Sequence, residues 1–141
     1  MIICLKQDCF IEVLELFNQD LTIVNKWYNN LSKRSEYKVS HVKGFYSSNN
    51  GISINGTDLV KSDGFIARIL MSEEGYQTNK DYQLNPKGWT LKNDDYIIKG
   101  IVNEVKSISE MKDSYECMKI TKIAIKDYGS VDMQHYEISG D

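Results

Sequence analysis

The sequence predicts a mainly β domain, a small antiparallel β-barrel or sandwich with one or two short helices. Polar and apolar residues alternate over several short segments, which are separated by Asn, Asp and Gly clusters. Helical spacing of apolar residues is confined to short stretches. A chain of 141 residues with 41% apolar composition can bury its own core. We therefore expect residues 1–141 to form one domain, with a helical extension at 1–19 and a barrel at 20–141.

The N-terminal helix is expected over residues 9–17. Asp8 precedes it as an N-cap candidate. Four apolar side chains follow the i, i+3, i+4, i+7 spacing of one helix face: Phe10, Val13, Leu14 and Phe17. The apolar face of this helix can pack on the barrel or on a neighbouring protein, and the sequence leaves both alternatives open.

From Asp20 onward, residues that share a face recur at every second position, which predicts the first strand. One side of that strand is expected to carry Leu21, Ile23, Asn25 and Trp27, and the other Thr22, Val24 and Lys26. Asn29 and Asn30 supply the turn that follows.

The next strand is expected over residues 37–46, with an irregularity. Tyr37, Val39 and His41 alternate in one phase, whereas Val42, Gly44 and Tyr46 alternate in the other. A β-bulge at 41–44 would explain this change of phase. Residues 47–63 are polar and are expected to form a loop, interrupted at most by a short strand at 52–54.

Residues 65–71 carry the strongest strand signal. Phe65, Ala67, Ile69 and Met71 share one face, and the opposite face is expected to be partly covered. A polar loop is expected at 72–80. Turns are expected at 85–88, where Pro86 stands second, and at 93–95, and a strand at 96–99 ends before Gly100.

The C-terminal third is expected to contain one helix and two strands. Ser107 and Glu110 match the S-x-x-E capping box, which predicts a helix ending near Tyr115. Residues 118–126 alternate regularly, with Met118, Ile120, Lys122 and Ala124 on one side. A turn at 127–130 precedes the last strand, at 134–138.

Composition excludes several classes of function. The formal charge is −3, from 17 Lys and Arg against 20 Asp and Glu. This balance is unlike that of proteins that grip phosphate backbones. No apolar run approaches the ~20 residues that span a bilayer, and no signal peptide or membrane association is expected. Three cysteines suit a reducing compartment better than a disulfide framework.

Three sets of residues suggest a catalytic or metal site, but each has a simpler structural interpretation. Cys117, Asp132 and His135 could be arranged as a nucleophile set, but Cys117 is better explained as a small apolar residue of a strand. Cys4, Cys9, His41 and His135 lack the short ligand spacings of zinc sites. Residues 93–95 lack the glycine and glutamate of a calcium loop. No catalytic residue, metal or cofactor is therefore expected.

The order of several short motifs resembles a family of small tailed-phage proteins that act in head and tail morphogenesis, often labelled minor capsid proteins. Residues 123–140 resemble the strand, Asp-containing turn and His-aromatic-Glu strand with which those proteins end. Residues 91–100, 42–46 and 63–69 resemble their other strands, so the similarity spans 21–141. Tyr46 and Tyr136 stand where the family has Trp.

The resemblance implies a structural, non-enzymatic protein of a phage or prophage particle. The most similar type is the head-closure (stopper) protein, a small barrel that forms a homo-oligomeric ring in the neck. It meets portal and adaptor proteins on one side and tail proteins on the other. DNA would pass its lumen without specific binding, and the ring would assemble in the bacterial host cytoplasm. A tail completion or tail terminator protein is the first alternative, and a small host binding module the second.

Contacts with neighbouring copies, or a channel gate, are expected in the two polar loops and at nearby aromatic residues. The candidate interface residues are Ser47, Asn49, Asn50, Asn55, Asp58, Lys61, Glu73, Glu74, Tyr76, Trp89 and Tyr136. The loops can equally be ordinary surface loops, and Trp89 and Tyr136 can equally lie in the core of the domain.

Overall fold

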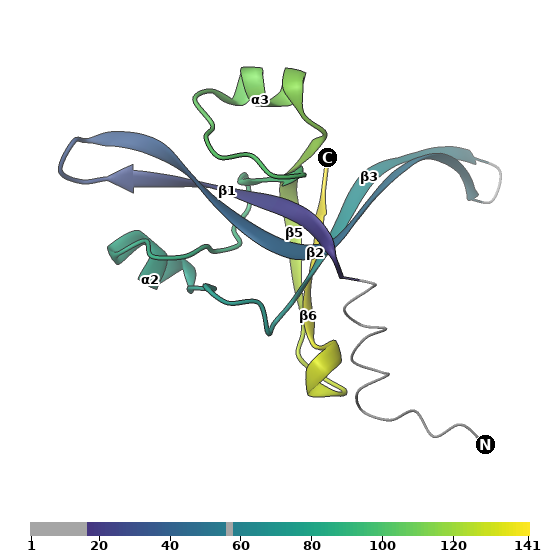
Figure 1. The fold of residues 1–141 in the computed structure, drawn as a ribbon. Helices are drawn as coiled ribbons and strands as arrows, with labels where there is room; N and C mark the ends of the chain where they lie inside the picture. Colours follow the sequence, from purple (N-terminus) through teal and green to yellow (C-terminus); the bar gives the residue numbers. More distant parts are fainter. Residues whose placement is uncertain (1–16, 56–57) are drawn as a thin grey trace.

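The computed structural model describes residues 17–55 and 58–141, and these form a closed antiparallel barrel (Figure 1). The strand order is β1–β2–β3–β6–β5–β4, with β4 pairing back to β1. The strands are β1 (Gln19–Asn29), β2 (Arg34–Asn55), β3 (Asp58–Leu70), β4 (Tyr96–Lys99), β5 (Cys117–Lys126) and β6 (His135–Gly140). The predicted barrel class is confirmed. The helix expected at 9–17 lies, except for Phe17, outside the described residues.

Short helices lie in the connections between strands. They are α2 (Asn79–Leu84), α3 (Ile108–Ser114) and the 3-10 turn η1 (Val131–Met133). The predicted helix start is confirmed, because the Ser107 side chain accepts a hydrogen bond from the Glu110 N–H as an N-cap. Thr78 caps α2 in the same way, from the Asp81 N–H. The loop expected at 72–80 is therefore only partly right, since its last two residues begin α2.

The interior of the barrel is filled with side chains. The members with no exposed surface are Leu21, Ile23, Ala67, Ile69, Ile97, Met118, Ile120 and Ile138. They come from strands far apart in the sequence and face one another inside the barrel, as alternation along each strand requires. One copy of the chain therefore offers a solid core and not a channel.

A second apolar layer covers the outside of β1 and β4. Val24 and Ile98 point outward from the barrel and pack with Val102, Val105 and Met111 of the segment that carries α3. Both faces of β1 are thus buried, which explains why its alternation includes apolar residues on each side. In Figure 1, α3 lies above β1 and β5.

The bulge predicted in β2 is wrong. β2 pairs with β1 in unbroken register from Arg34 to Gly44 and with β3 from Phe45 onward. The two phases of apolar residues instead face two different layers. Tyr37 and Val39 pack against the outer layer, whereas Val42 and Tyr46 lie in the barrel core.

Gly44 stands where β2 passes from one partner strand to the other. A Cβ at this position would lie 2.6 Å from the Arg68 carbonyl oxygen and 2.8 Å from Leu21 Cδ1. Only glycine allows so close an approach at a barrel corner. The phase change in the sequence therefore marks a corner of the barrel.

The regular alternation expected in β5 is also wrong after Ile120. The pairing of β5 with β6 shifts between Ile120 and Lys122, so β5 contains the irregularity that was expected in β2. Ile123 then pairs with the core residue Ile138 and packs against the core, instead of facing outward. The other strands predicted in the C-terminal half, at 96–99 and 134–138, are confirmed within one or two residues.

The loop predicted at 47–63 is wrong, because its backbone belongs to β2 and β3. Residues 49–55 pair in register with 58–64, and among the described residues they pair with nothing else. We call this two-stranded segment the ribbon. Seven residues of strand extend about 23 Å. In Figure 1 the ribbon and the β1–β2 hairpin project from opposite sides of the barrel.

Candidate functional site

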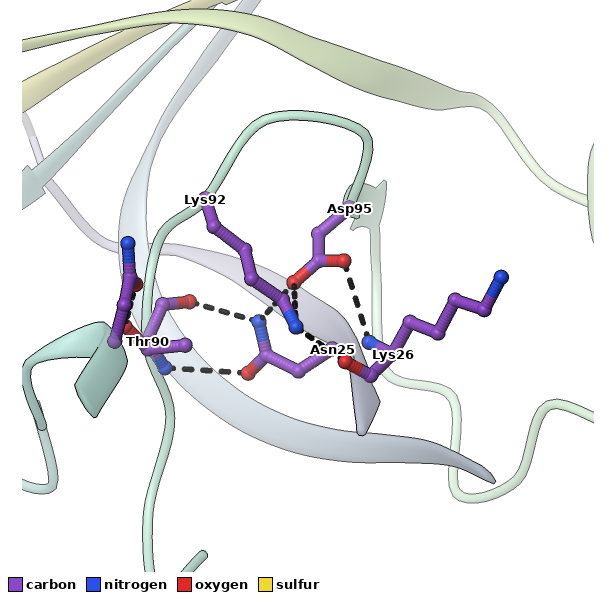
Figure 2. A network of polar contacts seen from close by, with 6 residues as sticks. Asn25, Lys26, Thr90, Lys92 and Asp95 are labelled. Carbon is purple, nitrogen blue, oxygen red and sulfur yellow. Dashed lines mark hydrogen bonds and ion pairs between the residues drawn. The ribbon is translucent and has the colours of Figure 1, made fainter. Parts of the chain in front are cut away.

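A buried polar network joins β1 to the segment before β4 (Figure 2). Asn25 Nδ2 donates to the Thr90 carbonyl and to Asp95 Oδ2, both at 2.8 Å, and Asn25 Oδ1 accepts from the Thr90 N–H at 3.2 Å. Asp95 Oδ1 accepts from the Lys26 N–H at 3.3 Å. Asn25, Thr90 and Asp95 are almost completely buried, so these bonds satisfy groups that water cannot reach.

The carboxylate of Asp95 is paired with a lysine at the edge of this network. Lys92 Nζ lies 3.7 Å from Asp95 Oδ2 and also donates to the Lys26 carbonyl. Burial raises the pKa of Asp95 above its ordinary value, although the Asn25 hydrogen bond and the Lys92 charge act in the opposite direction. The polar contacts of Asp95 thus connect the segment before β4 to β1.

Hydrogen bonds also connect α2 to Thr90 of this network and to the β1–β2 hairpin. Thr90 Oγ1 is 2.6 Å from Asn79 Oδ1 at the start of α2, which lies beside the hairpin. Trp27 Nε1 donates to the Gln83 carbonyl at 3.0 Å, and Gln83 Nε2 donates to the Tyr28 carbonyl at 2.9 Å. The hairpin is therefore held by α2.

Three of the candidate interface residues form an aromatic cluster. The ring centroid of Tyr76 lies 5.3 Å from the ring centroid of Trp89 and 4.8 Å from that of Tyr136. Trp89 and Tyr136 are buried in the barrel core, so their side chains are core residues and not exposed anchors. Tyr76 is 38% exposed and covers them. Burial raises the pKa of Tyr136, with Tyr76 adding to the effect.

The two glutamates of the expected loop have different roles. Glu73 Oε1 accepts a hydrogen bond from the Lys43 N–H at 2.6 Å, which ties the loop to β2. The Glu74 carbonyl accepts from Trp89 Nε1 at 2.8 Å, and its side chain is exposed. Glu74 therefore contacts the aromatic cluster through its backbone, whereas Glu73 connects the loop to β2.

The remaining candidates follow β2 and β3 into the ribbon. Ser47 is exposed on β2, opposite Ile66 of β3. The backbones of Asn49, Asn50, Asn55, Asp58 and Lys61 belong to the ribbon, and their side chains lie outside the described part of the structure. The structure thus separates the candidates into a group in or next to the ribbon and a group around Tyr76.

The nucleophile set weighed from the sequence is not brought together. His135 pairs with Lys126 at the end of β5 opposite to Cys117, and nine residues of strand span about 30 Å. Burial raises the pKa of Cys117, which disfavours the thiolate. Among the side chains that the structure describes, those of residues 17–48 and 64–141, no three His, Cys, Asp or Glu side chains are grouped to hold a metal ion. None of the helices described there is long and apolar enough to cross a membrane.

The surface also carries an apolar groove that no sequence pattern indicates. It has a volume of about 270 Å³ and is lined by Phe17, Asn18, Lys43, Leu70, Ser72 and Glu73. Phe17 and Leu70 are buried together, with Phe45 packed against them. The groove could not be predicted from spacing, because it combines the start of β1 with the end of β3.

Residues 16–141 match a family described as a family of unknown function (DUF6751), and the chain belongs to this family. No curated protein and no solved structure gave a significant match.

Proposed function

We propose that this member of the DUF6751 family is a structural protein of a tailed-phage or prophage particle, which forms part of the head-closure ring in the neck. In this role it seals the portal channel after DNA packaging and presents a surface for tail joining. The order of the short sequence motifs supports the proposal. The barrel class that such proteins share is also the class found here.

The observation that carries the proposal is the ribbon. Within the described chain, residues 49–55 pair only with 58–64, so each strand of the ribbon keeps one unpaired edge. Long unpaired edges are a liability in a free monomer, and proteins usually cover them. A ring in which the ribbon of one copy contacts a different face of the next would cover them through head-to-tail association.

The solid interior and the charge are consistent with a ring. Because the barrel core is filled, any DNA channel must lie between copies. The net charge of −3 gives the wall of such a channel little attraction for phosphate, which suits passage of DNA better than retention by tight binding.

Deletion of the gene from the phage or prophage genome tests the proposal. We expect filled heads that lose their DNA and fail to join tails, and complementation with the wild-type gene should restore both steps. In particles, mass spectrometry should find the chain in DNA-filled heads that lack tails. Its presence only in isolated tails would contradict head closure and favour the tail completion or terminator role. Its absence from all particles would favour a host binding module.

A shortened variant tests the ribbon itself. Asn49 and Gly64 are partners in the register, so an Asn-Gly turn between them can replace residues 50–63. The barrel should keep its thermal stability, while complementation should fail. Leu31→Ser, at the tip of the opposite hairpin, is the matched control, because Leu31 is 96% exposed and its loss leaves the ribbon intact. Normal complementation by the shortened variant would contradict the role of the ribbon.

A further inference from the structure

The groove lined by Phe17 is mainly apolar and lies at the point where the described chain begins. Its volume of about 270 Å³ is far larger than the ~30 Å³ of a single water molecule. Leu70 and Phe17 form its apolar part, and Lys43 and Glu73 stand at its rim. An open apolar surface of this kind is stabilised when another apolar side chain covers it.

Phe17 connects this groove to the N-terminal segment. Its ring is only 4% exposed, packs with Leu70 and lies 6.0 Å from the ring of His135. Phe17 is also the last residue of the apolar stripe formed by Phe10, Val13 and Leu14. In a helix, Val13 and Leu14 would stand about one turn, ~5.4 Å, before Phe17 on the same face. The last residue of the stripe, Phe17, thus lies at the groove, and a helix before it would direct Val13 and Leu14 toward the same surface.

We propose that residues 1–16 dock on their own barrel as an amphipathic helix, with Leu14 and Val13 in the groove. No linker separates the segment from the groove, so docking within one chain occurs at a high effective concentration. Glu12 and Glu15 fall on the opposite side of such a helix and remain in solvent. A helix of this length is marginal by itself in water, so docking would also supply its stability. The inference does not depend on the proposed function.

Disulfide trapping in the full-length chain tests the docking. Cys4, Cys9 and Cys117 are first replaced by serine, and Leu14→Cys is combined with Ser72→Cys at the groove. A disulfide needs the two Cα atoms within about 7 Å, so the bond reports proximity. The matched control combines Glu15→Cys with Ser72→Cys, which moves the thiol to the opposite helix face.

We expect the Leu14→Cys pair to form a disulfide within one chain about tenfold faster than the Glu15→Cys pair, because only the former faces the groove. Equal rates for the two pairs would overturn the docked face. A disulfide that links two chains would show that the segment occupies the groove of a second copy, and would overturn docking within one chain.

Hydrogen exchange of the unmodified protein gives a second test that needs no substitution. Amides of residues 13–17 should exchange at least about tenfold more slowly than in an unfolded peptide, because a docked helix protects them. In the full-length Leu14→Asp variant this protection should be lost, whereas Glu15→Gln should keep it. Exchange of the wild-type amides at the unfolded rate would overturn the proposal.

Discussion

Asn25 of β1 and Asp95, which precedes β4, are joined by a buried hydrogen bond of 2.8 Å although they lie 70 residues apart in the sequence. Their neighbours Val24 and Tyr96 form the last residue pair between β1 and β4. The side-chain bond therefore continues the backbone ladder that closes the barrel. It takes the place of a β-ladder contact where the chain passes from the 93–95 turn into β4.

Asn25→Ala should destabilise the protein by about 3 kcal/mol, because it leaves Asp95 and the Thr90 backbone groups buried with fewer partners. Urea unfolding followed by tryptophan fluorescence measures the change. Lys26→Ala is the control on the same strand. Its side chain is exposed and its backbone contacts are kept, so its effect should stay within about 0.5 kcal/mol. Equal effects of the two changes would contradict the role of the network.

Asp95→Asn should change how stability depends on pH. The folded-state pKa of Asp95 is raised above 3.8, mainly by burial, so the folded chain binds this proton more tightly than the unfolded chain. Stability from this group is then full below pH 3.8 and is lost as the pH rises through the folded pKa. The free energy of unfolding of the wild type minus that of Asp95→Asn should therefore be larger at pH 4 than at pH 7.

Urea titrations at several pH values between 4 and 7 check this sign. Asp94→Asn is the matched control, because Asp94 is an exposed carboxylate in the same turn. The same pH slope for the two variants, or a difference that grows toward pH 7, would show that burial of Asp95 is not the cause.

Gly44→Ala should cost about 2 kcal/mol, because the new methyl group would overlap the Arg68 carbonyl and Leu21 at the barrel corner. Gly64→Ala is the control, since the nearest atom to its Cβ is 3.9 Å away, an ordinary contact distance. Its effect should be close to zero or slightly stabilising. Thermal unfolding of the two variants measures the contrast, and similar melting temperatures would argue against a corner at Gly44.

Tyr46→Phe and Tyr82→Phe should each leave stability unchanged or raise it by about 1 kcal/mol. Among the described residues, both hydroxyl groups are buried without a hydrogen-bond partner, and an unsatisfied buried group is costly. Burial, with a smaller effect of Asp95, raises the pKa of Tyr82 to about 12. Tyr46→Leu is the control, because loss of the ring should destabilise the core by roughly 2 kcal/mol or more. A loss of stability in the Phe variants would indicate that the hydroxyl groups have partners.

Local patterns predicted the regular elements well. The β4 strand ends before Gly100 as expected, and Ser107 caps the start of α3 as expected. Such signals lie within a few residues of one another and reflect backbone geometry and capping. The sequence pattern predicts a strand incorrectly where its apolar residues face two different layers along its length. The second phase in β2 was interpreted as a bulge, because alternation alone does not reveal a second apolar layer around α3.

The candidate interface was predicted only in part for a related reason. The sequence indicates Tyr76, Trp89 and Tyr136 only as single aromatic residues. Their ring contacts depend on β6 passing beside the 76–89 segment. The ribbon was interpreted as a loop, since its sequence is polar and its pairing comes from backbone groups that every sequence carries.

By itself, the sequence determined the β-rich class, the positions of most strands and turns, and an acidic composition unsuited to gripping phosphate backbones. Those properties follow from short-range periodicity, turn chemistry and net charge. Only the tertiary structure decided which strands pair, where β2 turns its corner at Gly44, and that Asn25 meets Asp95. Closure of the barrel brings residues 70 positions apart into contact, and such contacts arise from packing of whole strands, which no local pattern encodes.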